Sequence, residues 1–277
     1  MFNSFSKSFL FAPLLSLLLG GVLVVSCGDD DNEEDVQASS SNQNGGTPAF
    51  DGEDKVFTVN GVSFKMIAVK GGTFQMGSDD GYEWEKPVHR VTLSDYYIGE
   101  TEVTQELWSA VMGSNPSRFS GNMQCPVEMV SWNDCQTFIS KLNELTGATF
   151  RLPTEAQWEF AARGGNKSKG YTYSGSNVID DVAWCGYNSG EMTHPVKTKA
   201  PNELGIYDMS GNVWEWCSDR YGSYSSAAQT DPTGSSTGSD RVRRGGGRSG
   251  LATCCRVAYR GRTPADSNGY LGLRLAH

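Results

Sequence analysis

The stretch Leu204–Trp216, which reads LGIYDMSGNVWEW, constrains the fold more than any other part of the chain. It joins two tryptophans, a tyrosine and two glycines, and it follows neither the period of an amphipathic helix nor that of an alternating strand. Glycine permits left-handed backbone, and tryptophan buries a large apolar surface. The chain holds 33 Gly, 10 Pro, 7 Trp, 11 Tyr and 12 Phe. This composition predicts a loop-rich fold anchored by aromatic side chains, neither a helix bundle nor a doubly wound sheet.

The same stretch carries two carboxylates, Asp208 and Glu215. Carboxylates and the backbone carbonyls of a turn are ligands that Ca²⁺ prefers. The spacing alone leaves two interpretations open, a calcium site or an aromatic turn with solvated acids.

The charge pattern excludes some classes of function. The net charge is −9, and six acids gather between Asp29 and Asp35. A nucleic-acid-binding protein would need a basic face, so no nucleic-acid partner is expected. Only three histidines occur, with no HExxH or CxxC motif, which disfavours a zinc site.

Residues 1–26 have the pattern of an export signal, with Lys7 before the apolar segment Phe9–Val25. Val24-Val25-Ser26-Cys27 resembles a bacterial lipobox, in which Cys27 would be acylated and become the mature N-terminus. Several acyl chains would give a stable membrane anchor. The alternatives are a plain secretory signal with an incidental cysteine, or a transmembrane helix.

Residues 27–53 are acidic and then rich in Ser, Asn and Gly, which predicts a disordered tether. Acids directly after a lipidated cysteine resemble a signal for display on the outer face. The expected location is therefore the outer membrane, as a surface-exposed lipoprotein.

Strands are expected from Val56 onward. Val56–Val59 and Val62–Val69 flank Asn60-Gly61, the pattern of a β-hairpin with a type I′ turn. Further strands are expected over 71–77, 89–93 and 96–98.

Three helices are expected, over Glu102–Met112, over Ser131–Leu145 and within Arg151–Gly165. Ser131 with Asp134, and Thr154 with Gln157, have the spacing of capping boxes. We therefore predict one α+β domain over residues 54–277, with short antiparallel strands and about three helices.

Four motifs in register resemble the formylglycine-generating enzyme (sulfatase-modifying factor) family. They are RLPTEAQWEFAARGG (151–165), GIYDMSGNVWEW (205–216), RVRRGG (241–246) and GLRL (272–275). The resemblance runs from about Met66 to the C-terminus. It implies a C-type-lectin-like fold with bound calcium, whose ligands would fall on Asp208, the Gly211 and Val213 carbonyls, and Glu215. The ligands of the family's other calcium site, expected near 184–193, cannot be matched.

The family's oxidases use two C-terminal cysteines that bind copper(I), and they convert a substrate cysteine, in sulfatases, into formylglycine. Thiolates suit Cu(I). By alignment the two positions fall on Gly250 and Ala252, so neither holds a thiol. Cys254 and Cys255 lie nearby, but adjacent side chains of an extended chain point to opposite faces. The alignment therefore speaks against formylglycine generation.

Six cysteines follow Cys27, namely Cys125, Cys135, Cys185, Cys217, Cys254 and Cys255. In an exported protein an even number permits disulfides. Buried free thiols that pack as small apolar side chains are the alternative.

A surface-anchored binding module is the preferred function. The segment 247–270 mixes Arg, Tyr and small polar residues, as binding surfaces do. It also resembles the variable segment of retroelement-diversified proteins. The expected contacts to an unknown protein or glycan ligand are Arg248, Ser249, Tyr259, Arg262, Asn268 and Tyr270.

Two other functions stay open. One is an oxidoreductase, either a copper enzyme using Cys254 or Cys255, or a non-haem iron enzyme using His89 and His194 with a carboxylate. The other is a structural component of an envelope complex.

Overall fold

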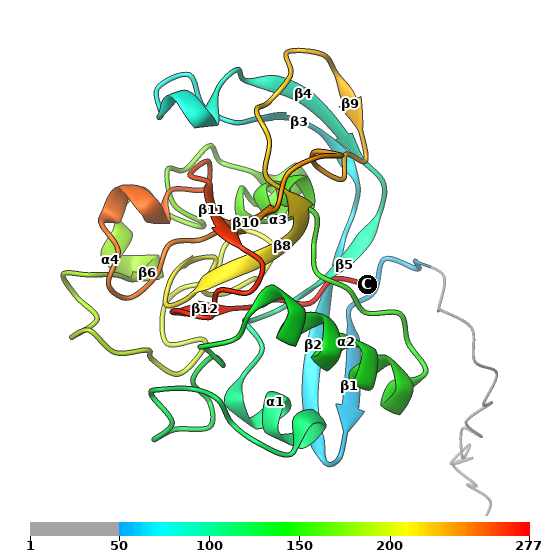
Figure 1. Cartoon of the computed structure of the whole chain (residues 1–277). Coiled ribbons are helices and arrows are strands. Elements are labelled where there is room, and N and C mark those ends of the chain that lie inside the picture. Colours follow the sequence, from blue (N-terminus) through cyan, green and yellow to red (C-terminus); the bar gives the residue numbers. More distant parts are fainter. Residues whose placement is uncertain (1–49) are drawn as a thin grey trace, which may run out of the picture. The chain divides into compact units, whose positions relative to one another are not determined.

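A computed structural model describes residues 50–277 (Figure 1). The export signal, Cys27 and nearly all of the predicted tether lie outside the described residues. Within residues 50–277, no helix is long and apolar enough to cross a bilayer.

The described chain begins with the expected hairpin. Strands β1 (Lys55–Val59) and β2 (Val62–Val69) pair antiparallel, and β5 (Tyr96–Gly99) extends the sheet beyond β2. Asn60 and Gly61 both have positive φ, 48° and 83°, as a type I′ turn requires. The local sequence therefore fixes this register.

Three helices of two or more turns follow, as predicted: α1 (Gln105–Met112), α2 (Trp132–Thr146) and α3 (Glu155–Ala162). Both predicted capping boxes form, at Ser131 and at Thr154. Helix α1 begins three residues later than predicted because the Thr104 side chain accepts a hydrogen bond from the Leu107 amide and caps the helix there. A further single-turn helix, α4, spans Ile179–Val182.

The remaining strands form three small sheets. β3 (Gly72–Met76), β4 (His89–Leu93) and β9 (Gln229–Thr230) form one; β6 (Ala183–Trp184) and β7 (Ser210–Gly211) form a second. The third has the order β11-β10-β8-β12, from β8 (Trp214–Arg220), β10 (Asp240–Arg244), β11 (Gly261–Pro264) and β12 (Leu271–Gly272). The pairs β4–β9, β6–β7 and β8–β12 are parallel, which the prediction of antiparallel strands did not include.

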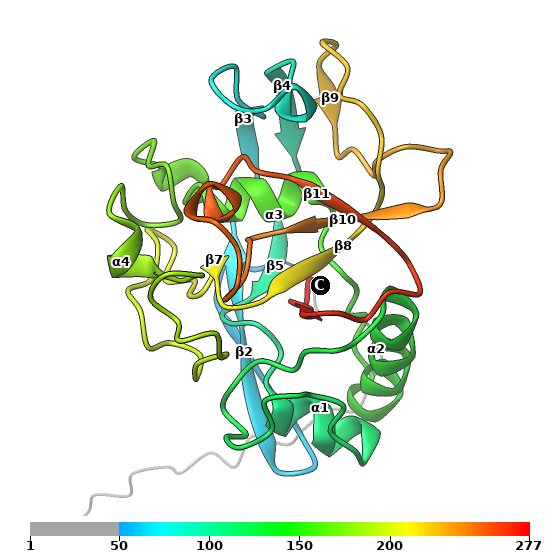
Figure 2. The same ribbon diagram turned by 60° about the vertical axis from the view of Figure 1, so that its left-hand side comes forward.

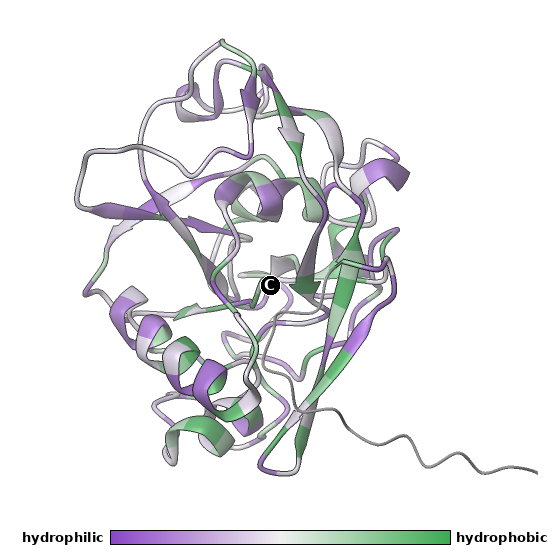
Figure 3. Ribbon diagram, turned by 90° about the vertical axis from the view of Figure 1, so that its right-hand side faces the viewer, coloured by the Kyte–Doolittle hydropathy of each residue, from purple (hydrophilic) through white to green (hydrophobic). Residues whose placement is uncertain are grey.

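Two apolar clusters hold these elements together. One packs α1 and α2 onto the first sheet, with the Trp108 and Phe138 rings stacked 4.8 Å apart. The other surrounds α3 and includes Trp158 and Met209. Figure 2 shows β8 and β10 beside α3, and Figure 3 shows green and purple residues alternating along α2. Strands β8 and β10 of the C-terminal sheet therefore lie against the apolar cluster that surrounds helix α3.

Candidate functional site

The C-terminal motif is anchored by a buried ion pair. The Arg274 guanidinium donates to both oxygens of Glu215, at 2.7 Å from Nη2 and 3.0 Å from Nε. Trp158 Nε1 donates to Glu215 as well, at 2.6 Å. All three side chains are fully buried. These contacts tie the 205–216 and 272–275 motifs to helix α3.

The same contacts bear on the predicted calcium site. Glu215 is engaged by Arg274 and Trp158, and Oδ2 of Asp208 accepts a hydrogen bond from the Lys197 amide. Burial raises the pKa of Asp208 to about 6. Burial also raises the pKa of Glu102, which faces the charges of Asp208 and Glu215. Within the described residues no group of three or more His, Cys, Asp or Glu side chains is arranged to hold a metal. Both carboxylates of the predicted site therefore already have partners within the described residues, and calcium binding stays a prediction.

A second buried network lies under the 241–246 motif. Arg244 donates to Glu155 at 2.9 Å and to Glu159 at 2.7 Å, and Arg260 donates to both oxygens of Glu155. Burial alone would raise the pKa of Glu159, but the charges of Arg163 and Arg244 outweigh it and lower the pKa to about 2. This network fixes β10 and the segment around Arg260 on helix α3.

The cysteines of the C-terminal segment lie on a 3-10 helical turn over Ala252–Cys255, not on the extended chain assumed above. Cys255 is fully buried and its thiol contacts that of Cys185. Cys254 is half-buried and its thiol contacts the Tyr259 hydroxyl. The two thiols therefore have different partners. All six cysteines that follow Cys27 are free.

An open groove with an aromatic wall lies beside Cys254. Seven residues line the aromatic groove, which encloses about 470 Å³: Trp84, Tyr221, Arg243, Tyr259, Arg260, Gly261 and Arg262. The rings of Tyr82 and Trp84 stack 4.6 Å apart and are 40% and 42% exposed. Tyr259 meets both rings edge-on, and Arg243 lies 4.3 Å from the ring centre of Trp214.

The six residues predicted to contact a ligand do not lie together in the structure. Tyr259 and Arg262 line the aromatic groove. Tyr270 is exposed elsewhere, where its hydroxyl accepts a hydrogen bond from Arg118. Asn268 and Ser249 are also exposed, and they lie outside the groove.

Arg248 differs from the prediction, because it is only 5% exposed. Its guanidinium lies 4.3 Å from the ring centre of Phe119 and 4.2 Å from that of Tyr270, and it donates to the Glu191 carbonyl. Arginine stacks well on aromatic faces, so Arg248 orders this segment instead of offering its charge to a ligand.

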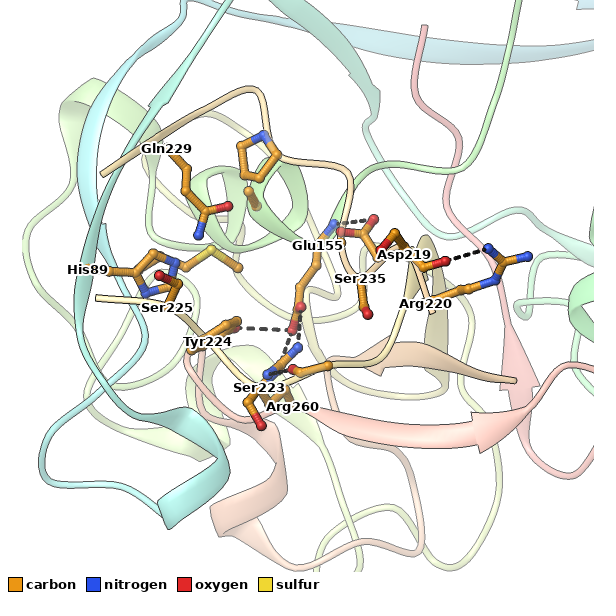
Figure 4. A pocket seen from close by; sticks show the side chains of 16 residues that line it. His89, Glu155, Asp219, Arg220, Ser223, Tyr224, Ser225, Gln229, Ser235 and Arg260 are labelled. Carbon is orange, nitrogen blue, oxygen red and sulfur yellow. Dashed lines mark hydrogen bonds and ion pairs between the residues drawn. The ribbon is translucent and has the colours of Figure 1, made fainter. Parts of the chain in front are cut away.

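Sequence reasoning missed a second cavity, which we call the serine-lined cavity (Figure 4). It encloses about 360 Å³ between β4, β8, β9 and the loop that joins β8 to β10. His89, Ser225 and Gln229 lie on one side, and Asp219, Arg220 and Ser235 on the other. Nearly 140 residues separate His89 from Gln229, and the parallel β4–β9 pair, with the hydrogen bonds from Ser94 to Asp231, brings them together. No local sequence signal could have shown this.

The two histidines of the iron hypothesis have other partners. His89 Nδ1 lies 3.0 Å from the Pro87 carbonyl, and the ring packs on Tyr224. The His194 ring stacks on Trp184 at 3.8 Å, and its Nε2 lies 2.8 Å from the Ser189 carbonyl. These contacts explain the position of each imidazole ring by packing and hydrogen bonding.

Comparison with known proteins places the whole described domain in one family. The sulfatase-modifying factor enzyme 1-like domain matches residues 56–277. Chaperone protein LppX of Paenibacillus barcinonensis is 37% identical over 258 residues, covering 75% of this chain and 87% of that protein. The formylglycine-generating enzyme of Streptomyces coelicolor is 31% identical over 285 residues, covering 76% and 88%.

Solved structures agree with this assignment. Treponema denticola variable protein 1 superposes with a TM-score of 0.75 at 37% identity, over 83% of this chain and 99% of that chain. PvdO from Pseudomonas aeruginosa shares the fold, with a TM-score of 0.65 at 24% identity, over 80% and 97% of the two chains. The chain therefore belongs to the sulfatase-modifying factor family and has the fold of the formylglycine-generating enzymes.

Proposed function

We propose that this chain is an exported, lipid-anchored protein of the cell envelope whose family domain binds a ligand at the aromatic groove and does not generate formylglycine. Export and lipidation rest on the lipobox-like sequence at Cys27. The absence of catalysis rests on Gly250 and Ala252, which stand where the oxidases carry cysteine. Calcium is proposed only as a structural ion, on the family resemblance of the 205–216 motif.

The exposed stacked pair of Tyr82 and Trp84 is the observation that carries the binding proposal. Burying aromatic rings of this size is a main source of affinity at protein interfaces, and here the two exposed rings stack into one contiguous surface. The names of two relatives, a chaperone protein and a variable protein, are compatible with a binding role.

The charge of the aromatic groove indicates the chemistry of the ligand. Arg243 Nε is buried and has no hydrogen-bond partner within the described residues. The nearest carboxylate oxygen to Arg262 belongs to Asp240, at 3.8 Å. Arg260 is already neutralised by Glu155. The exposed Arg262 guanidinium is therefore available beside two exposed rings, and Arg243 adds positive charge to the wall of the groove. An acidic protein segment with an apolar or aromatic residue would match both features.

Selection from a displayed peptide library against the detergent-solubilised protein tests this proposal. We expect the selected peptides to be acidic, and expect Trp84→Ala and Arg262→Ala each to weaken their binding at least fivefold. Leu145→Ala, an exposed apolar change on helix α2, is the matched control and should bind as the wild type does. Peptides of no common charge, or peptides insensitive to both groove variants, would overturn the assignment of the groove.

The alternative is a formylglycine-generating oxidase. The 31% identity to the Streptomyces enzyme favours it. It would have to use Cys254 or Cys255 at positions where the family does not, and the separate partners of these thiols count against that.

A further inference from the structure

The serine-lined cavity is a second built site, separate from the aromatic groove and beyond the proposed function. Arg260 forms a wall common to both spaces. The cavity volume of about 360 Å³ lies within the range of ligand pockets, about 300–1,000 Å³.

Most charged side chains in the wall of this cavity already form ion pairs or hydrogen bonds with other residues. Glu155 accepts hydrogen bonds from Arg244, Arg260 and Tyr224. Arg260 uses its remaining donor on the carbonyls of Gly222 and Trp84. The Arg260 guanidinium is therefore not free to bind an anion, whereas Arg220 donates only to the Ser236 carbonyl, at 3.4 Å, and has no carboxylate partner among the described residues.

Three side chains keep unused polar atoms. Asp219 is 3% exposed, and its Oδ2 accepts from the Glu155 amide at 3.0 Å and from the Ser218 hydroxyl at 2.9 Å. Its Oδ1 has no partner within the described residues. Neither the Gln229 amide nor His89 Nε2 has a partner there either. These polar atoms face the cavity and are free to exchange hydrogen bonds with water for hydrogen bonds with a ligand.

The charge of Asp219 also limits which kinds of ligand the serine-lined cavity can bind. Burial, and then the negative charge of Glu155, raise its pKa to about 7, so this carboxyl is partly neutral under ordinary conditions. Arg220 also lines the cavity and would repel a cation. The other polar groups of the wall are hydroxyls and an amide, from Ser223, Ser225, Ser235, Ser236 and Gln229, and Met76, Ala156 and Pro232 add apolar surface.

We propose that the serine-lined cavity binds one uncharged sugar unit, with Asp219 and Gln229 as its main hydrogen-bonding partners. A neutral polyol offers both donors and acceptors, which matches a wall of hydroxyls, an amide and one unpaired carboxyl oxygen.

Saturation-transfer NMR on the full chain tests this, with the methyl glycosides of glucose, galactose, mannose and N-acetylglucosamine as neutral probes and glucosamine and glucuronic acid as charged ones. We expect at least one to bind, and expect Gln229→Ala and Asp219→Asn each to weaken it about fivefold to tenfold. Gln136→Ala on helix α2 is the matched control and should have no effect.

Three results would overturn the proposal: no signal from any glycoside, signals unchanged in both cavity variants, or binding only of charged glucosamine or glucuronic acid. Trp84→Ala separates this site from the aromatic groove, since it should spare sugar binding while weakening the selected peptides. Loss of the sugar alone would leave the proposed function standing.

Discussion

Cys254 and Cys255 are neighbours in the chain, yet the Cys254 thiol contacts Tyr259 beside the open groove while the Cys255 thiol contacts Cys185 in the interior. Linear S–Cu–S coordination needs two thiolates that face one another. The half-buried Cys254 and the fully buried Cys255 do not provide this.

Copper(I) titration follows from this relationship. Competed against a chromophoric chelator, the protein should show no tight one-to-one site that depends on Cys254 and Cys255 together. Cys254→Ser should titrate as the wild type does, and any copper(I) held by the contacting Cys185 and Cys255 thiols should be lost in Cys255→Ser alone. A stoichiometric site abolished by either Cys254→Ser or Cys255→Ser, but not by Cys185→Ser, would restore the oxidase hypothesis.

Removing the guanidinium from Arg274 should strongly destabilise the fold. Arg274→Met leaves the Glu215 carboxylate buried without its cation, and breaking a buried pair in this way costs about 3–5 kcal/mol. Urea unfolding measures the loss. The double variant with Glu215→Gln should recover much of it, because the Gln oxygen can still accept from Trp158. A single variant within about 1 kcal/mol of the wild type would contradict this role for the pair.

Asp219 should make stability depend on pH. Its pKa is raised from 3.8 to about 7, so between these values the folded chain holds a proton that the unfolded chain has released. The stability due to this group is therefore full below about pH 4 and is lost as the pH rises through 7. Asp219→Asn removes the effect.

Relative to that of the wild type, the free energy of unfolding of Asp219→Asn should therefore increase as the pH rises from 4 to 8. The gain is at most about 4 kcal/mol, at 1.36 kcal/mol per pH unit. Asp266→Asn, an exposed change, is the control. If the two proteins keep a constant difference across this range, the raised pKa is refuted.

Local sequence signals predicted the local structure well. The Asn60-Gly61 turn and the capping boxes at Ser131 and Thr154 formed as expected, because each depends on residues no more than three or four positions apart. The burial of Arg248 depends on Phe119, 129 positions earlier, and the serine-lined cavity depends on the β4–β9 pair. Contacts of this range leave no periodic trace in the sequence.

The predicted calcium site has to be tested by measuring the melting temperature of the wild-type protein. The resemblance predicts that calcium raises the melting temperature relative to a chelator. Asp208→Ala alone cannot decide the question, because it also removes the hydrogen bond from the Lys197 amide. Identical melting of the wild type in calcium and in chelator would exclude a structural calcium ion.

Mass spectrometry of a sulfatase-type cysteine peptide, incubated with copper-loaded protein and oxygen, tests the central claim most directly. The account predicts that the cysteine stays unconverted, because Gly250 and Ala252 provide no thiolates and Cys254 and Cys255 have separate partners. Copper-dependent appearance of formylglycine, lost in Cys254→Ser or Cys255→Ser, would contradict the account and establish an oxidase.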